Sequence, residues 1–107
     1  MVKTKDEAIR LATKLISEAN KVFYIKKAYL YGSYAKDKQH EWSDIDVAIV
    51  SPDFQYIPED MSMKMLFRLA ATIAPEIEPI PLTEAEVDHP MLGTIGYSVV
   101  REGILLN

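Results

Sequence analysis

The sequence predicts a small domain of the α/β (α+β) class. Three observations lead to this prediction: segments with apolar residues at helical spacing, short β-favouring segments between them, and an alternating order of the two kinds. A chain of 107 residues has the length of one domain, spanning 1–107. Helices that alternate with strands along one chain are typical of a sheet packed against helices.

The first element is predicted to be an amphipathic helix over residues 5–21. Thr4 and Glu7 have the spacing of a capping box, in which the two side chains satisfy free amides at the helix start. The apolar stripe that should face the core consists of Ala8, Leu11, Ala12, Leu15, Ile16 and Ala19. Residues 27–31 then favour a strand, which should stop at Gly32 because glycine marks a turn.

Two further strands are predicted. Residues 44–51 should form a central strand, because the segment is apolar on both faces from Val47 onward. Residues 76–83 should form an edge strand, since Pro79 and Pro81 cannot donate hydrogen bonds to a neighbouring strand.

A second long helix is predicted over residues 61–74, and its buried face should include Met61 and Met65. Trp42 is expected to pack its loop against the core. Three shorter elements should follow the third strand: a helical turn at 84–88, a helix over 90–102 and a strand over 103–107.

Composition and charge exclude several classes of function. The chain contains no cysteine, which excludes disulfides, thiolate metal sites and thiol catalysis. The net charge is -4 at pH 7, so no overall positive field attracts nucleic acid, and direct nucleic-acid binding is not expected. No apolar run approaches the ~20 residues that span a membrane, and no apolar stretch follows the first lysines as in a signal peptide. We therefore expect a cytoplasmic protein without a membrane partner.

The segment SDIDVAIV places two carboxylates at the start of a strand. Asp44 and Asp46 are two residues apart, so both side chains project to the same side of the strand, about 6.6 Å apart along it. A hard divalent cation such as Mg²⁺ prefers oxygen ligands and would offset their mutual repulsion. The alternative is that both side chains are solvated at a strand end.

Gly32 and Ser33 end the preceding strand. A glycine lets the backbone approach a ligand closely, and a turn here would direct backbone amides and the Ser33 hydroxyl at a phosphate. Lys36 follows one helical turn later and is placed to supply a positive charge to the same group. The alternative is an ordinary turn between a strand and a loop.

Gly-Ser, ten intervening residues and Asp-x-Asp together resemble the signature of the DNA polymerase beta nucleotidyltransferase superfamily. The whole chain is most similar to the minimal nucleotidyltransferase branch, through its leading helix and the segments AYLYGSYAK, SDIDVAIVS, IEPIPLT and REGILL. The resemblance implies a polymerase beta palm-like fold, with a small mixed sheet of three to four strands flanked by helices. It also implies ATP as substrate and two Mg²⁺ ions as cofactors.

The same resemblance assigns roles to individual residues. Those at the phosphate-binding positions are Gly32, Ser33 and Lys36. Asp44 and Asp46 are implied to be catalytic and to bind the metal together with a third carboxylate on a neighbouring strand. Glu78 is the best match for that third catalytic carboxylate and metal ligand, and Glu76, two residues earlier on the same face, is the alternative.

Two positions depart from the family pattern. Asp37 stands where the family usually has glycine, and its acidic side chain either weakens phosphate binding or points to solvent. Lys36 stands where an arginine is common, which replaces a bidentate phosphate contact by a single-point contact.

Larger relatives carry extra domains that hold the acceptor, whereas 107 residues leave no obvious room for one. This favours a protein as the acceptor. The minimal branch resembles the antitoxin half of modules with helical HEPN-type toxins, so we expect AMP transfer from ATP to a hydroxyl of such a partner, within an oligomer or hetero-oligomer. Two alternatives stay open: a non-catalytic antitoxin that neutralises its partner by contact, and a transferase acting on a small molecule.

Overall fold

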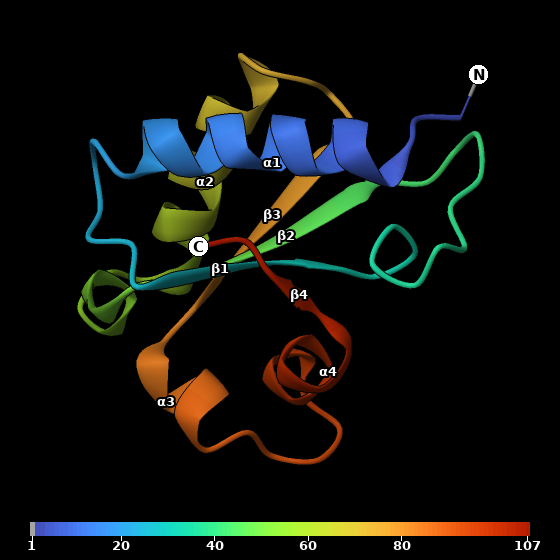
Figure 1. Ribbon diagram of the computed structural model, residues 1–107. Coiled ribbons are helices and arrows are strands. Elements are labelled where there is room, and N and C mark those ends of the chain that lie inside the picture. The colour runs from blue at the N-terminus through green and yellow to red at the C-terminus, as the bar shows by residue number, and fades with distance from the viewer. Residues whose placement is uncertain (1) are drawn as a thin grey trace.

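The computed structural model describes residues 2–107 and contains a four-stranded mixed sheet with helices on both faces (Figure 1). The strands are β1 (Lys27–Tyr31), β2 (Ile45–Val50), β3 (Ile77–Leu82) and β4 (Ile104–Leu105). The helices are α1 (Lys5–Ala19), the 3-10 helix η1 (Pro52–Gln55), α2 (Glu59–Ala71), α3 (Glu84–Asp88) and α4 (Ile95–Glu102). The strand order is β3-β2-β1-β4, which confirms the predicted fold class.

The capping box predicted at the start of α1 is confirmed. The Glu7 amide donates to Thr4 Oγ1 at 3.1 Å, and the Thr4 amide donates to Glu7 Oε1 at 3.2 Å. All six residues of the predicted stripe are buried. The helix ends at Ala19, two residues before the predicted end.

The strands take the places that their composition predicts. β2 pairs with β1 antiparallel and with β3 parallel, so the apolar segment after Asp46 is central. A parallel pair needs a crossover connection, which η1 and α2 supply. β3 pairs with β2 alone, so Pro79 and Pro81 lie on an edge strand, where a missing amide is tolerated.

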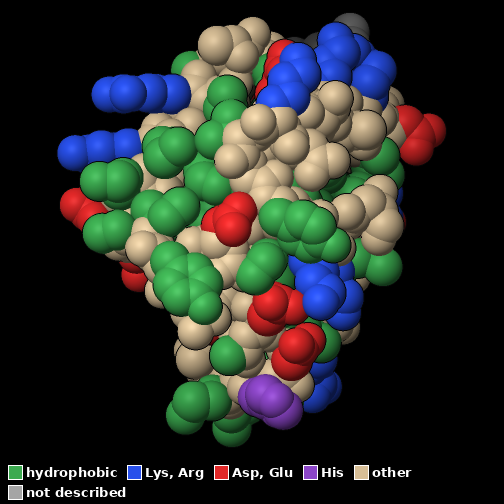
Figure 2. Space-filling view, turned by 90° about the vertical axis from the view of Figure 1, so that its left-hand side faces the viewer, with side chains coloured by type: hydrophobic (Ala, Val, Ile, Leu, Met, Phe, Trp, Pro, Cys, Tyr) green, Lys and Arg blue, Asp and Glu red, His purple; other side chains and the backbone are tan. Residues whose placement is uncertain are grey.

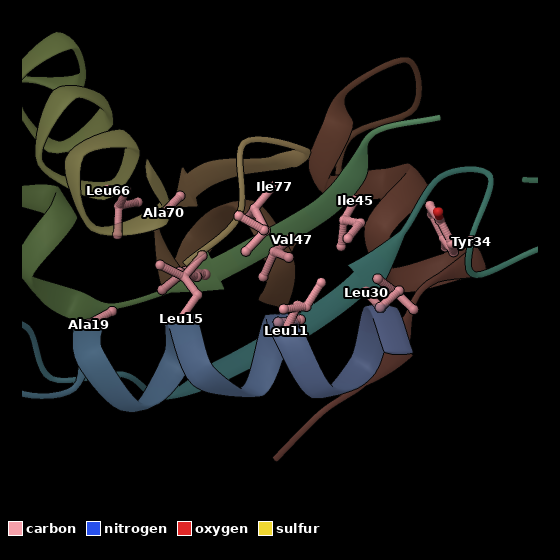
Figure 3. Packing of buried hydrophobic residues seen from close by; sticks show 14 of the residues in the cluster. Leu11, Leu15, Ala19, Leu30, Tyr34, Ile45, Val47, Leu66, Ala70 and Ile77 are labelled. Carbon is pink, nitrogen blue, oxygen red and sulfur yellow. The ribbon is translucent and has the colours of Figure 1, made fainter. Parts of the chain in front are cut away.

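The two faces of the sheet carry separate hydrophobic clusters. Ile45, Val47 and Ile49 of β2 point to the face covered by α1 and α2, where the larger cluster lies (Figure 3). The smaller cluster lies on the opposite face beneath α3 and α4 and consists of Ala48, Val50, Leu82, Val87 and Val99. The strand residues in this cluster, Ala48, Val50 and Leu82, come from the later parts of β2 and β3, so the beginnings of these strands are left for polar side chains.

Two predictions about buried side chains are wrong. Met61 is 53% exposed, because α2 begins at Glu59 and turns Ser62, Leu66 and Ala70 inward instead. The Ser62 hydroxyl donates to the Glu59 carbonyl at 3.1 Å, which satisfies it in the interior. Met65 is partly buried and packs against the larger cluster, as predicted. Trp42 is 83% exposed and does not pack its loop against the core.

The last helix is shorter than predicted. α4 starts at Ile95, five residues after the predicted start at Pro90. Gly93 has a φ of +89°, a left-handed conformation that no helix continues through, and the Thr94 side chain then caps the helix by accepting from the Tyr97 amide at 3.3 Å. The predicted closing strand is confirmed as β4, which pairs antiparallel with β1.

The surface in Figure 2 mixes charges of both signs. Lys and Arg side chains gather at the top of this face, and Asp and Glu side chains are scattered among hydrophobic ones below. Across residues 2–107, every helix is too short or too polar to cross a membrane.

Candidate active site

The beginnings of β2 and β3 bring acidic side chains together on the face of the smaller cluster. Asp46 and Glu78 are partners in the parallel register of β2 and β3. Tyr31 is the partner of Asp46 in the antiparallel register with β1. Asp44 immediately precedes β2, is exposed, and lies close enough to Glu78 to raise the pKa of that carboxyl. Asp44, Asp46 and Glu78, which were all predicted for the site, are therefore neighbours.

Burial and neighbouring carboxylates raise the pKa values of Asp46, Glu78 and Tyr31. Burial, followed by the negative charge of Asp44, raises the pKa of Asp46 to about 6. The hydrogen bond with Asp44 is the main reason that the pKa of Glu78 is raised, ahead of burial and the charges of both aspartates. Burial and the charges of Asp46 and Glu78 raise the pKa of Tyr31 to about 12.

Cations of the protein do not compensate these carboxylates. The ion pairs found within residues 2–107 involve other acids, namely Glu76, Asp37, Glu18, Glu84 and Glu102. Within the same residues, no group of three or more Asp, Glu, His or Cys side chains is arranged closely enough to hold an ion between them. The donor set nevertheless fits a hard divalent cation, because carboxylate oxygens are the ligands that such a cation prefers and its charge would offset the repulsion among these acids.

Glu76 and Glu78 were the two candidates for the third carboxylate, and the structure places them differently. Glu76 forms an ion pair with Lys3, with 2.6 Å between Nζ and Oε2. Glu78 contacts Asp44 instead and lies beside Asp46 in the sheet register. Of the two, Glu78 has the position that a shared site requires.

Gly32 brings the backbone of the preceding turn against Asp46. Its φ is +74°, in the left-handed region that favours glycine. A Cβ added at Gly32 would lie 2.2 Å from Asp46 Oδ2, which is far inside contact distance. Any other residue would therefore strain the backbone and displace the carboxylate.

The residues after Gly32 form a compact helical turn. The Lys36 amide donates to the Gly32 carbonyl at 3.3 Å, and the Lys38 amide donates to the Ser33 carbonyl at 2.9 Å. Because the hydrogen bonds of the turn begin at the Lys36 amide, the amide of Ser33 is not used within it, as at the start of a helix. An anion placed there would meet donors rather than acceptors.

Two side chains of this turn are engaged elsewhere. Lys36 Nζ forms an ion pair with Glu102 Oε2 at the end of α4, and this contact lowers the pKa of Glu102. Asp37 has a φ of 56°, which explains why glycine suits this position. Its Oδ2 accepts a hydrogen bond from Lys5 Nζ at 2.8 Å, so the side chain is directed to α1.

A pocket of about 200 Å³ opens beside Asp46 and Glu78. Pro79 and Ile80 of β3 also line it, together with four residues from other elements: Tyr31 of β1, Met63 and Phe67 of α2, and Ile95 of α4. None of these four was among the residues predicted for the site. The alternation of side chains along β1 could have indicated Tyr31 once the register of β1 with β2 was known. The approach of α2 and α4 to the carboxylates depends on tertiary packing, which no local sequence pattern encodes.

The mixed sheet holds carboxylates on adjacent strands beside a glycine-serine turn, and the comparisons with known proteins identify the class of this fold as nucleotidyltransferase. Residues 13–107 match the family described as polymerase beta, nucleotidyltransferase. The chain therefore belongs to the polymerase beta nucleotidyltransferase family.

Individual relatives agree with this assignment. A "Putative protein adenylyltransferase" of Methanocaldococcus jannaschii is 34% identical over 83 residues, which cover 77% of this chain and 78% of the relative. The crystal structure of a "putative nucleotidyltransferase" from Sulfolobus solfataricus has a TM-score of 0.71 at 24% identity, over 94% of this chain and 80% of that one. A mutant of the toxin–antitoxin pair MntA–HpeT has a TM-score of 0.58 at 21% identity, over 98% and 73%. Both structures support the fold.

Proposed function

We propose that this nucleotidyltransferase transfers AMP from ATP to a hydroxyl of a partner protein in a metal-dependent reaction. The observation that carries the proposal is the group of crowded carboxylates, Asp44, Asp46 and Glu78, directly beside the turn that begins at Gly32. The similarity to a protein described as an adenylyltransferase of proteins supports AMP as the transferred group and a protein as the acceptor.

In this proposal the turn binds the nucleotide. The backbone of Gly32 and Ser33 holds the terminal phosphates of ATP, since the close approach at Gly32 and the free first amide suit an anion. Lys36 adds a positive charge to the same phosphates after it leaves Glu102. Both side chains of this ion pair are exposed to solvent, so breaking it costs little.

The carboxylates would hold the cation. Asp44, Asp46 and Glu78 are the residues placed to bind Mg²⁺, as two ions when ATP is present. Bound Mg²⁺ supplies charge neutralisation for the phosphates, which is the main requirement of nucleotidyl transfer. The protein itself contributes positioning, because it holds Asp46 and Glu78 on adjacent strands and Asp44 directly before the first of them.

The transfer is an in-line displacement. The oxygen of the acceptor hydroxyl forms a bond to the α-phosphorus of ATP, while the bond from that phosphorus to the oxygen bridging the β-phosphate breaks. Pyrophosphate leaves with that bonding pair, and the proton of the hydroxyl passes to the ionised Glu78 carboxylate. Glu78 is placed to accept this proton, because it lies beside Asp46 on the adjacent strand at the edge of the site.

We further propose that the partner is a helical toxin of the HEPN type and that the chain acts as its cytoplasmic antitoxin. The fold neighbour from a toxin–antitoxin pair supports this assignment. A non-catalytic antitoxin, the alternative raised by Asp37, gains no support from the contact that Asp37 makes. Its carboxylate is paired with Lys5, so its repulsion of a phosphate is reduced.

Intact mass spectrometry of the partner that co-purifies with this chain tests the proposal. The expected result is a mass gain in steps of one AMP after ATP and Mg²⁺ are added, and no gain with the Asp44→Asn/Asp46→Asn double variant. An unmodified partner in an intact, neutralised complex would overturn AMP transfer and leave the binding antitoxin. A gain that persists in the double variant would overturn the assigned carboxylates.

A further inference from the structure

Trp42 is an exposed tryptophan in the loop that leads into the carboxylate site. It is 83% exposed, although tryptophan is on average a highly buried residue. It stands two residues before Asp44, and both line a pocket of about 370 Å³ whose other walls include Lys3, Pro75 and Glu76. The proposed reaction does not use this indole ring.

Three hydrogen bonds close the loop that presents Trp42. The Ser43 amide donates to the His40 carbonyl at 3.0 Å, and the His40 amide donates to Ser43 Oγ at 2.9 Å. The Trp42 amide donates to His40 Nδ1 at 3.2 Å. The backbone at Trp42 is therefore fixed by contacts within a turn, directly before the aspartate that is assigned to the cation.

Two pockets adjoin the carboxylates, and they differ in size. The pocket beside Asp46 and Glu78 has a volume of about 200 Å³, whereas the pocket shared by Asp44 and Trp42 has about 370 Å³. Pockets that enclose whole small ligands have roughly 300–1,000 Å³, so the second of the two is large enough for a nucleoside. With the phosphates of a nucleotide at the turn and on the carboxylates, its nucleoside would extend into this larger pocket.

Resting on the proposed transferase function, we infer that the pocket beside Trp42 binds the base of the nucleotide donor, that Trp42 stacks on this base, and that the site accepts adenine and guanine alike. The indole ring offers a flat apolar face, and stacking depends on the face of a base rather than on its edge. A purine covers more of the indole than a pyrimidine does, because it has two fused rings. Trp42 is then a specificity-determining residue for the size of the base.

The polar side chains of the lining are engaged in other contacts. Lys3 Nζ and Glu76 Oε2 pair with each other at 2.6 Å. The Ser43 hydroxyl oxygen already accepts from a backbone amide, and Glu41 is exposed to solvent. The lining thus favours stacking over recognition of the edge groups by which adenine and guanine differ. ATP and GTP should therefore bind alike.

Tryptophan fluorescence tests the stacking directly, because Trp42 is the only tryptophan in the chain. The full chain with Mg²⁺ is exposed to acrylamide, a quencher that has to touch the indole, in the presence of ATP, GTP or inorganic tripolyphosphate. Saturating ATP and GTP are each expected to lower the quenching constant at least threefold, whereas tripolyphosphate, which has no base, should leave it unchanged. Equal protection by tripolyphosphate, or no protection by ATP, would overturn the stacking.

Affinities for different nucleotides test the selection of purines. The Kd values for ATP and GTP, measured by calorimetry, should agree within threefold, and the Kd for CTP should be at least fivefold higher. A CTP affinity equal to that for ATP would overturn the selection of purines. A Kd for GTP more than threefold above that for ATP would overturn the equal acceptance of the two purines.

Variants of the loop separate the base from the phosphates. Loss of stacking on an aromatic side chain weakens binding roughly 5–150-fold, so Trp42→Ala should raise the Kd for ATP at least fivefold and leave the Kd for tripolyphosphate within twofold. Trp42→Phe keeps an aromatic face and should bind ATP within threefold of the wild type. Tyr56→Ala is the matched control, because Tyr56 is an aromatic residue that is 80% exposed but lies outside this pocket. Thermal melting of each variant confirms that it is folded.

The outcomes distinguish this inference from the proposed function. AMP transfer to the co-purified partner by Trp42→Ala with an unchanged KM for ATP would overturn the base site and leave the transferase intact. Protection of Trp42 by ATP without AMP transfer to that partner would overturn the transferase and leave the base site as that of a nucleotide-binding protein. Dissociation of the partner from Trp42→Ala with an unchanged Kd for ATP would assign Trp42 to the protein interface and likewise overturn the base site.

Discussion

The two faces of the central sheet are built from the same strands but differ in how completely they are covered. On the face of α1 and α2, the side chains of Leu30, Ile45, Val47 and Ile49 have no exposed surface. On the opposite face, Ala48 and Val50 are buried under α3 and α4, whereas Asp46 is only partly covered. A single strand, β2, thus contributes to a closed face and to a half-open one.

Stability and chemistry are located on different faces of the sheet. Apolar burial on the closed face stabilises the fold, whereas the half-open face concentrates like charges that oppose folding. The pKa of Asp46 is raised to about 6, which means that the folded protein disfavours the charged form of this side chain. Substitutions on the two faces should therefore have opposite effects on activity and stability.

Asp46→Asn is expected to have the largest effect on activity. Loss of one charge-stabilising group from a preorganised site typically lowers kcat roughly 10²–10³-fold. The same change removes a charge that the folded state disfavours, so the metal-free protein should melt at a higher temperature at pH 7. Rates of AMP transfer and melting curves in EDTA check the two parts. A fall in melting temperature together with full activity would contradict the contrast between the faces.

Leu30→Ala should show the converse behaviour. Leu30 is fully buried on the closed face, and truncation of such a leucine costs about 2–5 kcal/mol in the free energy of unfolding. Denaturant unfolding measures this loss. The kcat per folded molecule should stay at the wild-type value, since the side chain points away from the carboxylates. A loss of kcat in the folded fraction would show that the two faces are not independent.

The closed face could be predicted almost completely from the sequence. Helical spacing identified every buried residue of α1, and the prolines of β3 identified an edge strand. Both signals are local, because they depend only on residues that are close together in the sequence. Met61 was placed wrongly because the buried face of α2 begins at Ser62, and an apolar pattern does not identify a serine as a buried residue.

The half-open face was predicted in part. Asp44, Asp46 and Gly32 follow from a short motif, and the structure brings them together with Glu78. The pocket wall from α2 and α4 could not be predicted, because it joins helices separated by a whole strand. The ion pair of Lys36 with Glu102 is likewise a product of tertiary packing.

Gly32→Ala tests the close approach of the turn to Asp46. A left-handed backbone costs an alanine about 1–2 kcal/mol, and the added Cβ would in addition displace Asp46 Oδ2, which lies 2.2 Å away. We expect a loss of both stability and transfer activity. Gly93→Ala is the matched control, since Gly93 is also left-handed but a Cβ there meets nothing within 4 Å. It should lose stability alone, and equal activity in the two variants would contradict the contact.

The metal-free protein should become less stable as the pH rises from about 4 to about 6. The pKa of Asp46 is about 6 in the folded state against an ordinary value of 3.8, so the folded protein binds this proton more tightly than the unfolded chain. The resulting stabilisation is complete below the lower value and is lost as the pH passes the higher one. Glu78, whose pKa is also raised, acts in the same direction. Melting temperatures in EDTA should show this slope, and Asp46→Asn should reduce it.

Asp37→Gly is expected to have the smallest effect, because this carboxylate, unlike Asp46, already has a cation beside it. Glycine relieves the left-handed backbone at φ 56°, but it increases the entropy of the unfolded chain and removes the pair with Lys5. These contributions oppose each other, so the free energy of unfolding should change by less than about 1 kcal/mol. The KM for ATP should change by less than about threefold, which corresponds to less than 1 kcal/mol. A tenfold fall in the KM for ATP would show that Asp37 repels the phosphates despite Lys5, and Lys5→Met, which leaves the acid unpaired, should then raise the KM further.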